Sequence, residues 1–233
     1  MKLGIMQPYF LPYIGYWQLI NVVDKFIVYD NVEFSRRGWF HRNQILMNEK
    51  PKLFSLPIKN DSDYLNVNQR FLANNFRLEM NKVLGQVKSS YIKAPFFYEV
   101  YPIIEKCFHY KSQNLFDFIF YSIKEVTNFL NIKTEILISS ETTIDHNLKG
   151  KERVFAFCEH FDTRTYINSI GGKKLYAKES FKKKNIDLKF LQVNTIQYKQ
   201  FSKEFVPFLS ILDIMMFNSV EDIAILLNEY TFE

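Results

Sequence analysis

Cysteine is scarce in this chain, with two residues, Cys107 and Cys158, in a sequence of 233 residues. Two cysteines do not make a disulfide framework in a chain of this size, and neither belongs to a CxxC pair. The first residues, MKLGIMQP, lack the apolar core of a secretory signal peptide and run directly into proline. We therefore expect a cytoplasmic protein in a reducing compartment.

Long apolar runs and metal-binding patterns are also missing. The longest apolar stretches, such as FVPFLSILDIMMF, are too short to span a bilayer, so no membrane span is expected. Seven glycines and seven prolines leave no low-complexity linker. The four histidines are scattered, and no HxH, HExxH or DxD pattern occurs, so we expect no metal site and no cofactor.

The composition is that of a globular protein with a heavy aromatic load. Hydrophobic residues make up 47% of the chain and charged residues 24%, with 24 Phe and 14 Tyr to bury. Much of the net charge of +5 comes from lysines between residues 171 and 185, and lysine runs are usually solvated. No zinc-finger spacing, RNP motif or long basic helix accompanies it, so nucleic acid is not an expected partner. An anionic small molecule such as a nucleotide sugar fits the excess of positive charge equally well.

The first third of the chain predicts strands around one helix. Residues 3–6 are expected to form a buried strand that ends near Gln7, because Pro8 and Pro12 interrupt regular structure. A helix over 13–23 and a strand over 24–30 would complete a right-handed βαβ unit. Residues 39–46 and 52–58 alternate well enough for a hairpin.

The rest of the chain predicts helices first and then alternation. Helices are expected over 71–91, 96–110 and 114–130, the last one capped by Asn114 and ending near Asn131. Strands are expected over 134–140, 165–169 and 188–194, and helices over 149–161, 176–185 and 220–230. The sequence thus predicts a single α/β domain of residues 1–233, with a Rossmann-like parallel sheet and a helical insertion over about 66–131.

The segment QPYFLPYIGY follows the first strand, where open α/β sheets bind their ligands. We expect it to form a cleft wall, with Gln7, Tyr13 and Tyr16 as substrate-binding residues. Its layout also resembles nucleotidylyltransferases of the HIGH-motif kind. PYIGY lacks the histidines that stabilise the transferring phosphoryl group, which argues against nucleotidyl transfer and leaves nucleotide binding open.

The stretch DNVEFSRRGWFHRN is the densest group of chemically active side chains. Arginine forks suit phosphate or carboxylate, tryptophan offers a face to a sugar or base, and histidine moves protons near neutral pH. In an extended segment, Trp39, His41 and Asn43 would share one face and point together into a cleft. The alternative is an exposed loop with solvated arginines. The candidates are Asp30, Arg37, Trp39, His41, Arg42 and Asn43.

Two further features have both a functional and a plain structural interpretation. Cys158 is either a nucleophile paired with a distant base or, like most cysteines on an apolar helix face, a core residue. In GGKKLY, the N–H groups around Gly171 and Gly172 suit a phosphate, with charge from Lys173, although two glycines also simply make a tight turn.

Six blocks of sequence resemble the WbqC-like protein family, in matching order: MKLGIMQPYFLPYIGYWQLI, RRGWFHRNQI, KAPFF, LKGKERV, TYINSIGGKKLY and YKQFSKEFVPFLSILDIMMFN. Members more often carry asparagine at the position of His41. The residues that match the family's motifs are Gln7, Pro8, Tyr13, Gly15, Arg37, Gly38, Trp39, Arg42, Asn43, Lys149, Arg153, Asn168, Gly171, Gly172, Tyr198, Lys199 and Asp213.

The resemblance implies a role in assembling O-antigens and other bacterial surface polysaccharides. The implied reaction is transfer of a glycyl or similar acyl group from a carrier-protein thioester to the amine of a nucleotide-linked amino sugar. The expected partners are that sugar and an acyl-carrier protein. The alternatives are a non-catalytic subunit that binds either of them and a divergent nucleotidylyltransferase-like enzyme.

The implied chemistry needs a base, oxyanion donors and a diphosphate site. His41 or Asp30 would supply the base, and Asn43, Asn168 or backbone N–H groups the donors. Arg37, Arg42 and Lys173 would hold the diphosphate, with Lys199 as a further binding residue. A homodimer could form through apolar faces of residues 111–130 and 205–217, for which core packing is the alternative.

Overall fold

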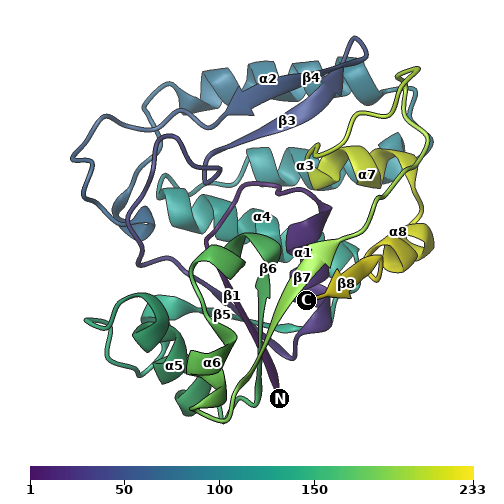
Figure 1. Ribbon diagram of the computed structural model, residues 1–233. Coiled ribbons are helices and arrows are strands. Elements are labelled where there is room, and N and C mark those ends of the chain that lie inside the picture. Colours follow the sequence, from purple (N-terminus) through teal and green to yellow (C-terminus); the bar gives the residue numbers. More distant parts are fainter.

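The computed structural model describes residues 1–233 and is built on a six-stranded sheet in the order β5-β2-β1-β6-β7-β8 (Figure 1). All neighbouring strands are parallel except β8, which runs antiparallel to β7. The expected mixed α/β fold with a mostly parallel sheet is therefore confirmed. The strands are β1 (Lys2–Met6), β2 (Lys25–Val28), β5 (Glu135–Ile138), β6 (Thr165–Ser169), β7 (Asp187–Val193) and β8 (Tyr230–Phe232).

Helices cover both faces of the sheet, which is why its strands are apolar on both sides. Leu3, Ile5 and Ile27 pack in a core of buried side chains with α5 (Gly150–His160) and α6 (Lys178–Lys182). Phe26 and Val28 point to the opposite face and join the larger core, to which α1 (Ile14–Val22) contributes. Successive residues of a strand point to opposite faces, so β2 serves both cores.

The middle of the chain is helical, as the sequence predicts. It contains the short η1 (Val67–Gln69), α2 (Phe76–Tyr91), α3 (Phe97–Phe108) and α4 (Leu115–Phe129). The Asn114 side chain accepts hydrogen bonds from the backbone of Phe116 and Asp117, so the predicted cap is confirmed. Asn131, with φ 55°, ends the helical segment in the left-handed conformation that asparagine tolerates.

The predicted hairpin is a separate two-stranded sheet of β3 (Arg42–Met47) and β4 (Lys50–Ser55). Asn48 and Glu49, with φ of 52° and 61°, make a two-residue turn, so the strands extend closer to the turn than expected, whereas at their far ends they are shorter than expected. The hairpin and α2 form a layer above the main sheet (Figure 1).

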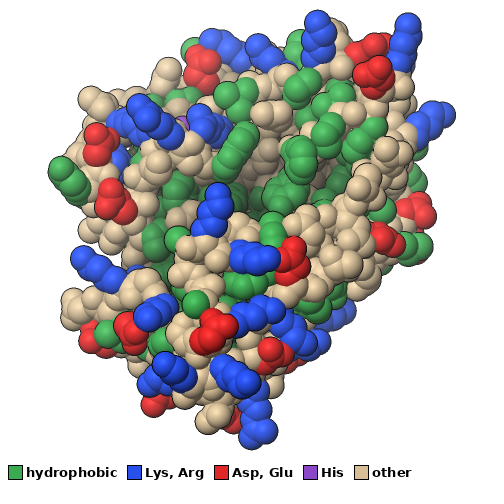
Figure 2. All heavy atoms as spheres, viewed as in Figure 1, with side chains coloured by type: hydrophobic (Ala, Val, Ile, Leu, Met, Phe, Trp, Pro, Cys, Tyr) green, Lys and Arg blue, Asp and Glu red, His purple; other side chains and the backbone are tan.

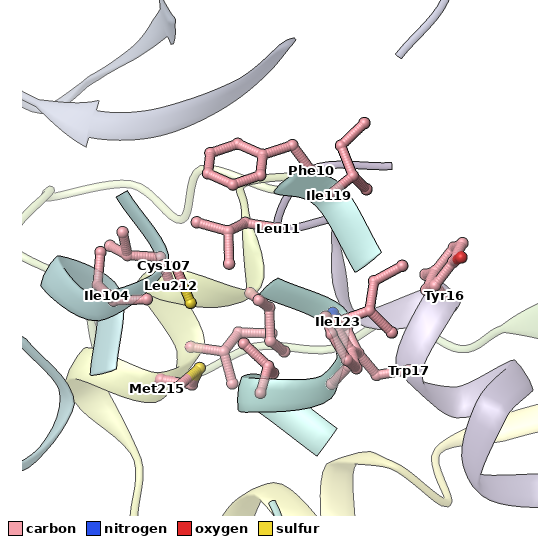
Figure 3. Close-up of a cluster of buried hydrophobic side chains, with 14 of the residues drawn as sticks. Phe10, Leu11, Tyr16, Trp17, Ile104, Cys107, Ile119, Ile123, Leu212 and Met215 are labelled. Carbon is pink, nitrogen blue, oxygen red and sulfur yellow. The ribbon is translucent and has the colours of Figure 1, made fainter. Parts of the chain in front are cut away.

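The C-terminal part holds elements that the sequence did not predict. They are α7 (Ile211–Phe217), β8 and the short η2 (Ser139–Glu141) and η3 (Ile170–Lys174), alongside the expected α8 (Val220–Leu226). Figure 3 shows side chains of α7 packed with Phe10 and Leu11 of the opening segment and with Ile104 and Cys107 of α3. The two stretches considered for a homodimer contribute α4 and α7 to this core. No helix combines the length and apolar character needed to cross a bilayer.

Candidate functional site

A cleft of about 800 Å³ opens at the carboxyl ends of β1, β2 and β6. The strands β2 and β5 lie on one side of β1 and β6, β7 and β8 on the other, so the strand order reverses between β1 and β6. Open α/β sheets bind ligands at this kind of switch point. We call it the switch-point cleft. Its lining includes Gln7, Tyr9, Tyr29, Asn31, Glu33, Lys149, Arg153, Tyr166, Asn168, Gly171, Gly172 and Tyr176.

Arg153 brings a positive charge to this cleft from the first turns of α5. Its guanidinium donates to the backbone carbonyls of Leu148 at 2.8 Å, Asn31 at 3.3 Å and His146. All of these acceptors are neutral, and neither Arg153 nor Lys149 belongs to an ion pair. The cleft therefore contains two cations that form no ion pair, and one carboxylate, Glu33, also lines it.

The N-terminus of α5 adds to the same positive potential. No side chain caps it, and Lys149 and Gly150 at this end line the cleft. The first N–H groups of a helix lack partners within the helix, and its dipole favours an anion there. The arrangement of Arg153, Lys149 and this helix end suits a phosphate or carboxylate.

The loop that carries Arg153's acceptors is held to β2. The Asn31 amide donates to Nδ1 of His146 at 3.0 Å, and Nε2 of His146 contacts the carbonyl of Thr142 at 3.0 Å. The Arg153 guanidinium also lies 5.2 Å from the centre of the Tyr29 ring. Burial raises the pKa of Tyr29, while the charge of Arg153 opposes the rise, so the phenol stays neutral.

Asn168 and Gly172 shape the opposite wall. The Asn168 amide donates to the hydroxyl of Tyr166 at 3.1 Å and its oxygen accepts from the backbone of Ser169 at 2.7 Å. A Cβ on Gly172 would lie 2.8 Å from Nδ2 of Asn168, closer than side chains tolerate. Glycine at 172 is thus required for Asn168 to lie against this turn.

A second hollow, of about 460 Å³, adjoins the switch-point cleft and shares Tyr9 with it. We call it the aromatic hollow. Figure 2 shows the molecule hollowed between the sheet below and the hairpin layer above, with hydrophobic side chains gathered around the hollow. The aromatic hollow is lined by Tyr9, Pro12, Tyr13, Trp39, Asn43, Gln44, Pro207 and Phe208.

A third hollow, of about 640 Å³, lies beyond Tyr13 and Phe208 along residues 192–198 and 205–209. Its wall is fixed by the fully buried carboxylate of Asp213. This carboxylate accepts hydrogen bonds from Tyr91 at 2.7 Å, Tyr198 at 2.6 Å and Gln200 at 2.8 Å. Burial raises its pKa, and the three donors oppose the rise.

Trp39, His41 and Asn43 were expected to point together into a cleft, and two of the three do so. Trp39 and Asn43 line the aromatic hollow and His41 does not, because β3 begins at Arg42 and strand alternation does not extend back to His41. The His41 ring packs against Phe34, with ring centres 5.3 Å apart, and its Nδ1 is buried without a partner. Burial and two nearby arginines lower the pKa of His41 to about 4, which makes it a weak base.

The stability of the protein should therefore depend on His41 between pH 6.5 and 4. Because the folded-state pKa lies below the unfolded value of 6.5, the contribution of His41 is complete above pH 6.5 and is lost as the pH falls toward 4. In urea titrations across this range, His41→Asn should lose less stability on acidification than the parent protein. The exposed His160, changed to Asn, is the control, and identical profiles for the parent and His41→Asn would contradict this reasoning.

Two other candidates line none of the three hollows. The buried carboxylate of Asp30 accepts from Ser140 N at 2.9 Å, Ser140 Oγ at 2.6 Å and Asn68 at 2.7 Å, so it ties the end of β2 to its neighbours. Cys158 lies in the core between α5 and the sheet, where burial raises its pKa to about 12. This environment suits a packing residue and gives no support to a nucleophile.

Of the remaining candidate residues, Tyr16 supports the cleft and the others line none of the three hollows. Tyr16 is buried and donates to the carbonyl of Gln7 at 3.1 Å, so it supports the cleft from beneath. Arg42 lies over the Trp39 ring at 5.3 Å and donates to the carbonyl of Arg37. Arg37 and Lys199 are exposed and line none of the three hollows, and Lys173 pairs with Glu233 at the surface.

The structure thus brings Gln7, Asn168, Gly171 and Gly172 together in the switch-point cleft, and Tyr13, Trp39 and Asn43 in the aromatic hollow. Sequence reasoning did not choose Tyr9, Glu33, Gln44, Lys149, Arg153 or Phe208 as site residues. Lys149 and Arg153 lie in the LKGKERV block, which was the available signal. No three His, Cys, Asp or Glu side chains come together in a way that could hold a metal ion.

Comparison with known proteins gives one family and one relative. Residues 7–225 match the WbqC-like protein family. Uncharacterized protein Rv1507c of Mycobacterium tuberculosis is 34% identical over 58 residues, which make up 25% of this chain and 25% of that protein. The match thus spans a quarter of the curated relative's length. No solved structure matches the chain.

Proposed function

The chain belongs to the WbqC-like protein family, and from this premise and the geometry of the cleft we propose that it binds a nucleotide-linked amino sugar and acylates its amine. The acyl group is an aminoacyl group such as glycyl, delivered as a carrier-protein thioester. The reaction would serve the assembly of O-antigen or a related bacterial surface polysaccharide.

The observation that carries this proposal is the unpaired charge of Arg153 in the switch-point cleft. Arg153, Lys149 and the uncapped end of α5 together favour an anion of two charges, as a diphosphate is. The strand order supports a Rossmann-like, nucleotide-binding interpretation of the sheet, since such sheets bind nucleotides at the switch point.

The proposed reaction forms a C–N bond and breaks a C–S bond. The sugar's ammonium first loses a proton, and the free amine attacks the thioester carbonyl. The carrier thiolate then leaves and takes up the second proton, which the attacking nitrogen loses as the amide forms. Glu33 is the acidic residue that lines the switch-point cleft and would accept the ammonium proton, and the second N–H of the Asn168 amide would donate to the oxyanion.

The adjacent Gly171 and Gly172 allow a matched test of the cleft wall that Asn168 forms. Gly172→Ala should lower acceptor binding or turnover about tenfold or more, since its Cβ must displace Asn168 from the cleft. Gly171→Ala should lower both much less, because the nearest protein atom to its Cβ is 3.8 Å away and Asn168 keeps its place. Titration calorimetry and initial rates measure the two effects. Equal effects of both substitutions would remove Asn168 from the proposed site.

A second candidate is a binding subunit without catalysis. It is favoured by the core position of Cys158 and by the lowered pKa of His41, which leave no nucleophile and base side by side. Mass spectrometry of the sugar after incubation with acylated carrier protein separates the two functions. An N-acylated product supports the transferase, whereas tight binding without product supports the subunit. Pyrophosphate released only with magnesium would instead indicate nucleotidyl transfer.

A further inference from the structure

The aromatic hollow exposes an unusual group of side chains. Three separate segments contribute Tyr13, Trp39 and Phe208, which are 37%, 48% and 77% exposed. Clustered exposed aromatic side chains mark binding sites more often than chance exposure does. Burial raises the pKa of Tyr9, at the boundary with the switch-point cleft, to about 12, so this phenol adds no charge.

Two features show that the exposed rings are held in place. Phe208 has φ 59°, a conformation that costs a residue with a side chain about 1 kcal/mol or more. The strained backbone conformation does not bury the Phe208 ring, which is mostly exposed. Gly15 lets the Tyr13 ring lie over the start of α1, because a Cβ there would be 2.5 Å from the Tyr13 hydroxyl.

The polar lining of the hollow narrows the class of ligand. No Asp, Glu, Lys, Arg or His lines it, so it suits an uncharged group. The Asn43 amide is already used by the carbonyls of Phe10 and Leu11 and by the backbone N–H of Gln44. The side-chain amide of Gln44 makes no hydrogen bond within the protein, and it offers one donor and one acceptor side by side.

We propose that the aromatic hollow binds the nucleobase of a nucleotide whose phosphates lie in the switch-point cleft. A base has two flat faces for aromatic stacking and a donor–acceptor edge that pairs with one amide. The Tyr13 hydroxyl, the Trp39 indole N–H and the Gln44 amide are the polar side-chain groups here that make no hydrogen bond within the protein, and of these only the Gln44 amide presents a separate donor and acceptor side by side, as the edge of a base requires. The inference rests on the proposed function for the phosphate end of the ligand, and Tyr9 links the two sites.

Because the two tryptophans differ in exposure, fluorescence quenching can measure binding in the aromatic hollow. Trp17 is fully buried and Trp39 is half exposed, so acrylamide quenching of fluorescence reports mainly on Trp39. Uridine or adenosine should shield Trp39 from acrylamide in the parent protein. Because these nucleosides carry no phosphate, they should shield it equally in Arg153→Gln. In Trp39→Ala, nucleoside should leave quenching unchanged, and the affinity for the nucleoside diphosphate should fall about tenfold, the usual loss of one stacked base.

The outcomes separate this inference from the proposed function. Inorganic pyrophosphate should raise the melting temperature without shielding Trp39. If pyrophosphate does so while neither nucleoside shields Trp39, the nucleobase site is wrong and the phosphate site stands. Shielding of Trp39 by free amino sugar and not by nucleoside would also overturn the inference, in favour of a sugar site. If neither pyrophosphate nor nucleoside binds, the proposed function fails as well.

Discussion

Replacing Arg153 by glutamine should weaken binding of nucleoside diphosphates about a hundredfold, or nearly 3 kcal/mol. The change removes the guanidinium charge, which forms no ion pair with a carboxylate, from the lining of the cleft. Glutamine keeps an amide donor, so part of the contact with neighbouring carbonyls survives. Titration calorimetry at two salt concentrations measures the loss, which should shrink at high salt because screening weakens the charge interaction in the parent protein.

Two further variants test whether Arg153 acts through its charge. Arg153→Lys should bind more tightly than Arg153→Gln, since it keeps the charge and loses the planar fork. Lys149→Ala should cost less than Arg153→Gln, because the Lys149 side chain is exposed. If Arg153 only holds the loop of residues 146–148, lysine and glutamine should be equally harmful and both should lower the melting temperature.

Replacing Asp213 by alanine should destabilise the fold by about 3 kcal/mol or more. The substitution leaves three buried donors, from Tyr91, Tyr198 and Gln200, without their acceptor. These donors join α2 and the segment of residues 198–200 to α7, so the third hollow should open with them. Urea titration measures the loss. The control is Asp187→Ala, whose carboxylate is 59% exposed and whose loss should cost about 0.5 kcal/mol or less.

The pH dependence of Asp213 has a defined sign. Because burial raises its folded-state pKa above 3.8, its contribution to stability is complete below pH 3.8 and is lost as the pH rises through the raised value. The stability of the parent protein minus that of Asp213→Asn should therefore fall as the pH rises from 3.8. A difference that grows over this range, or an alanine variant as stable as the parent, would contradict the role given to the carboxylate.

The sequence predicts the strands, the helical middle segment and the caps of α4 because their signals are local. Alternation, apolar runs and Asn114 each act within a few residues. The short strand β8 has three residues, too few for alternation to indicate a strand, and it forms by pairing with residues 191–193 of β7. In α7, nearly every residue is buried, so no helical period separates an apolar face from a polar one.

The sequence predicts site residues correctly where their position at the end of a strand places them in the cleft. Gln7 follows β1 and Asn168 belongs to β6, and both reach the cleft because neighbouring parallel strands end at the same edge. Arg153 reaches the cleft through contacts with the distant Asn31, which no local pattern reveals. For His41 the sequence pattern is misleading, because alternation predicts that its side chain faces the cleft, whereas β3 begins at Arg42.

The most direct test of the proposed acceptor is a thermal-shift measurement with a nucleotide-linked amino sugar and its N-acylated form. A ligand that binds only the folded protein raises the melting temperature. The amino form should raise it, the N-acylated form should raise it less, and Arg153→Gln should lose the response. If no nucleotide raises the melting temperature of the parent protein, the switch-point cleft is not a nucleotide site and the proposed function is wrong.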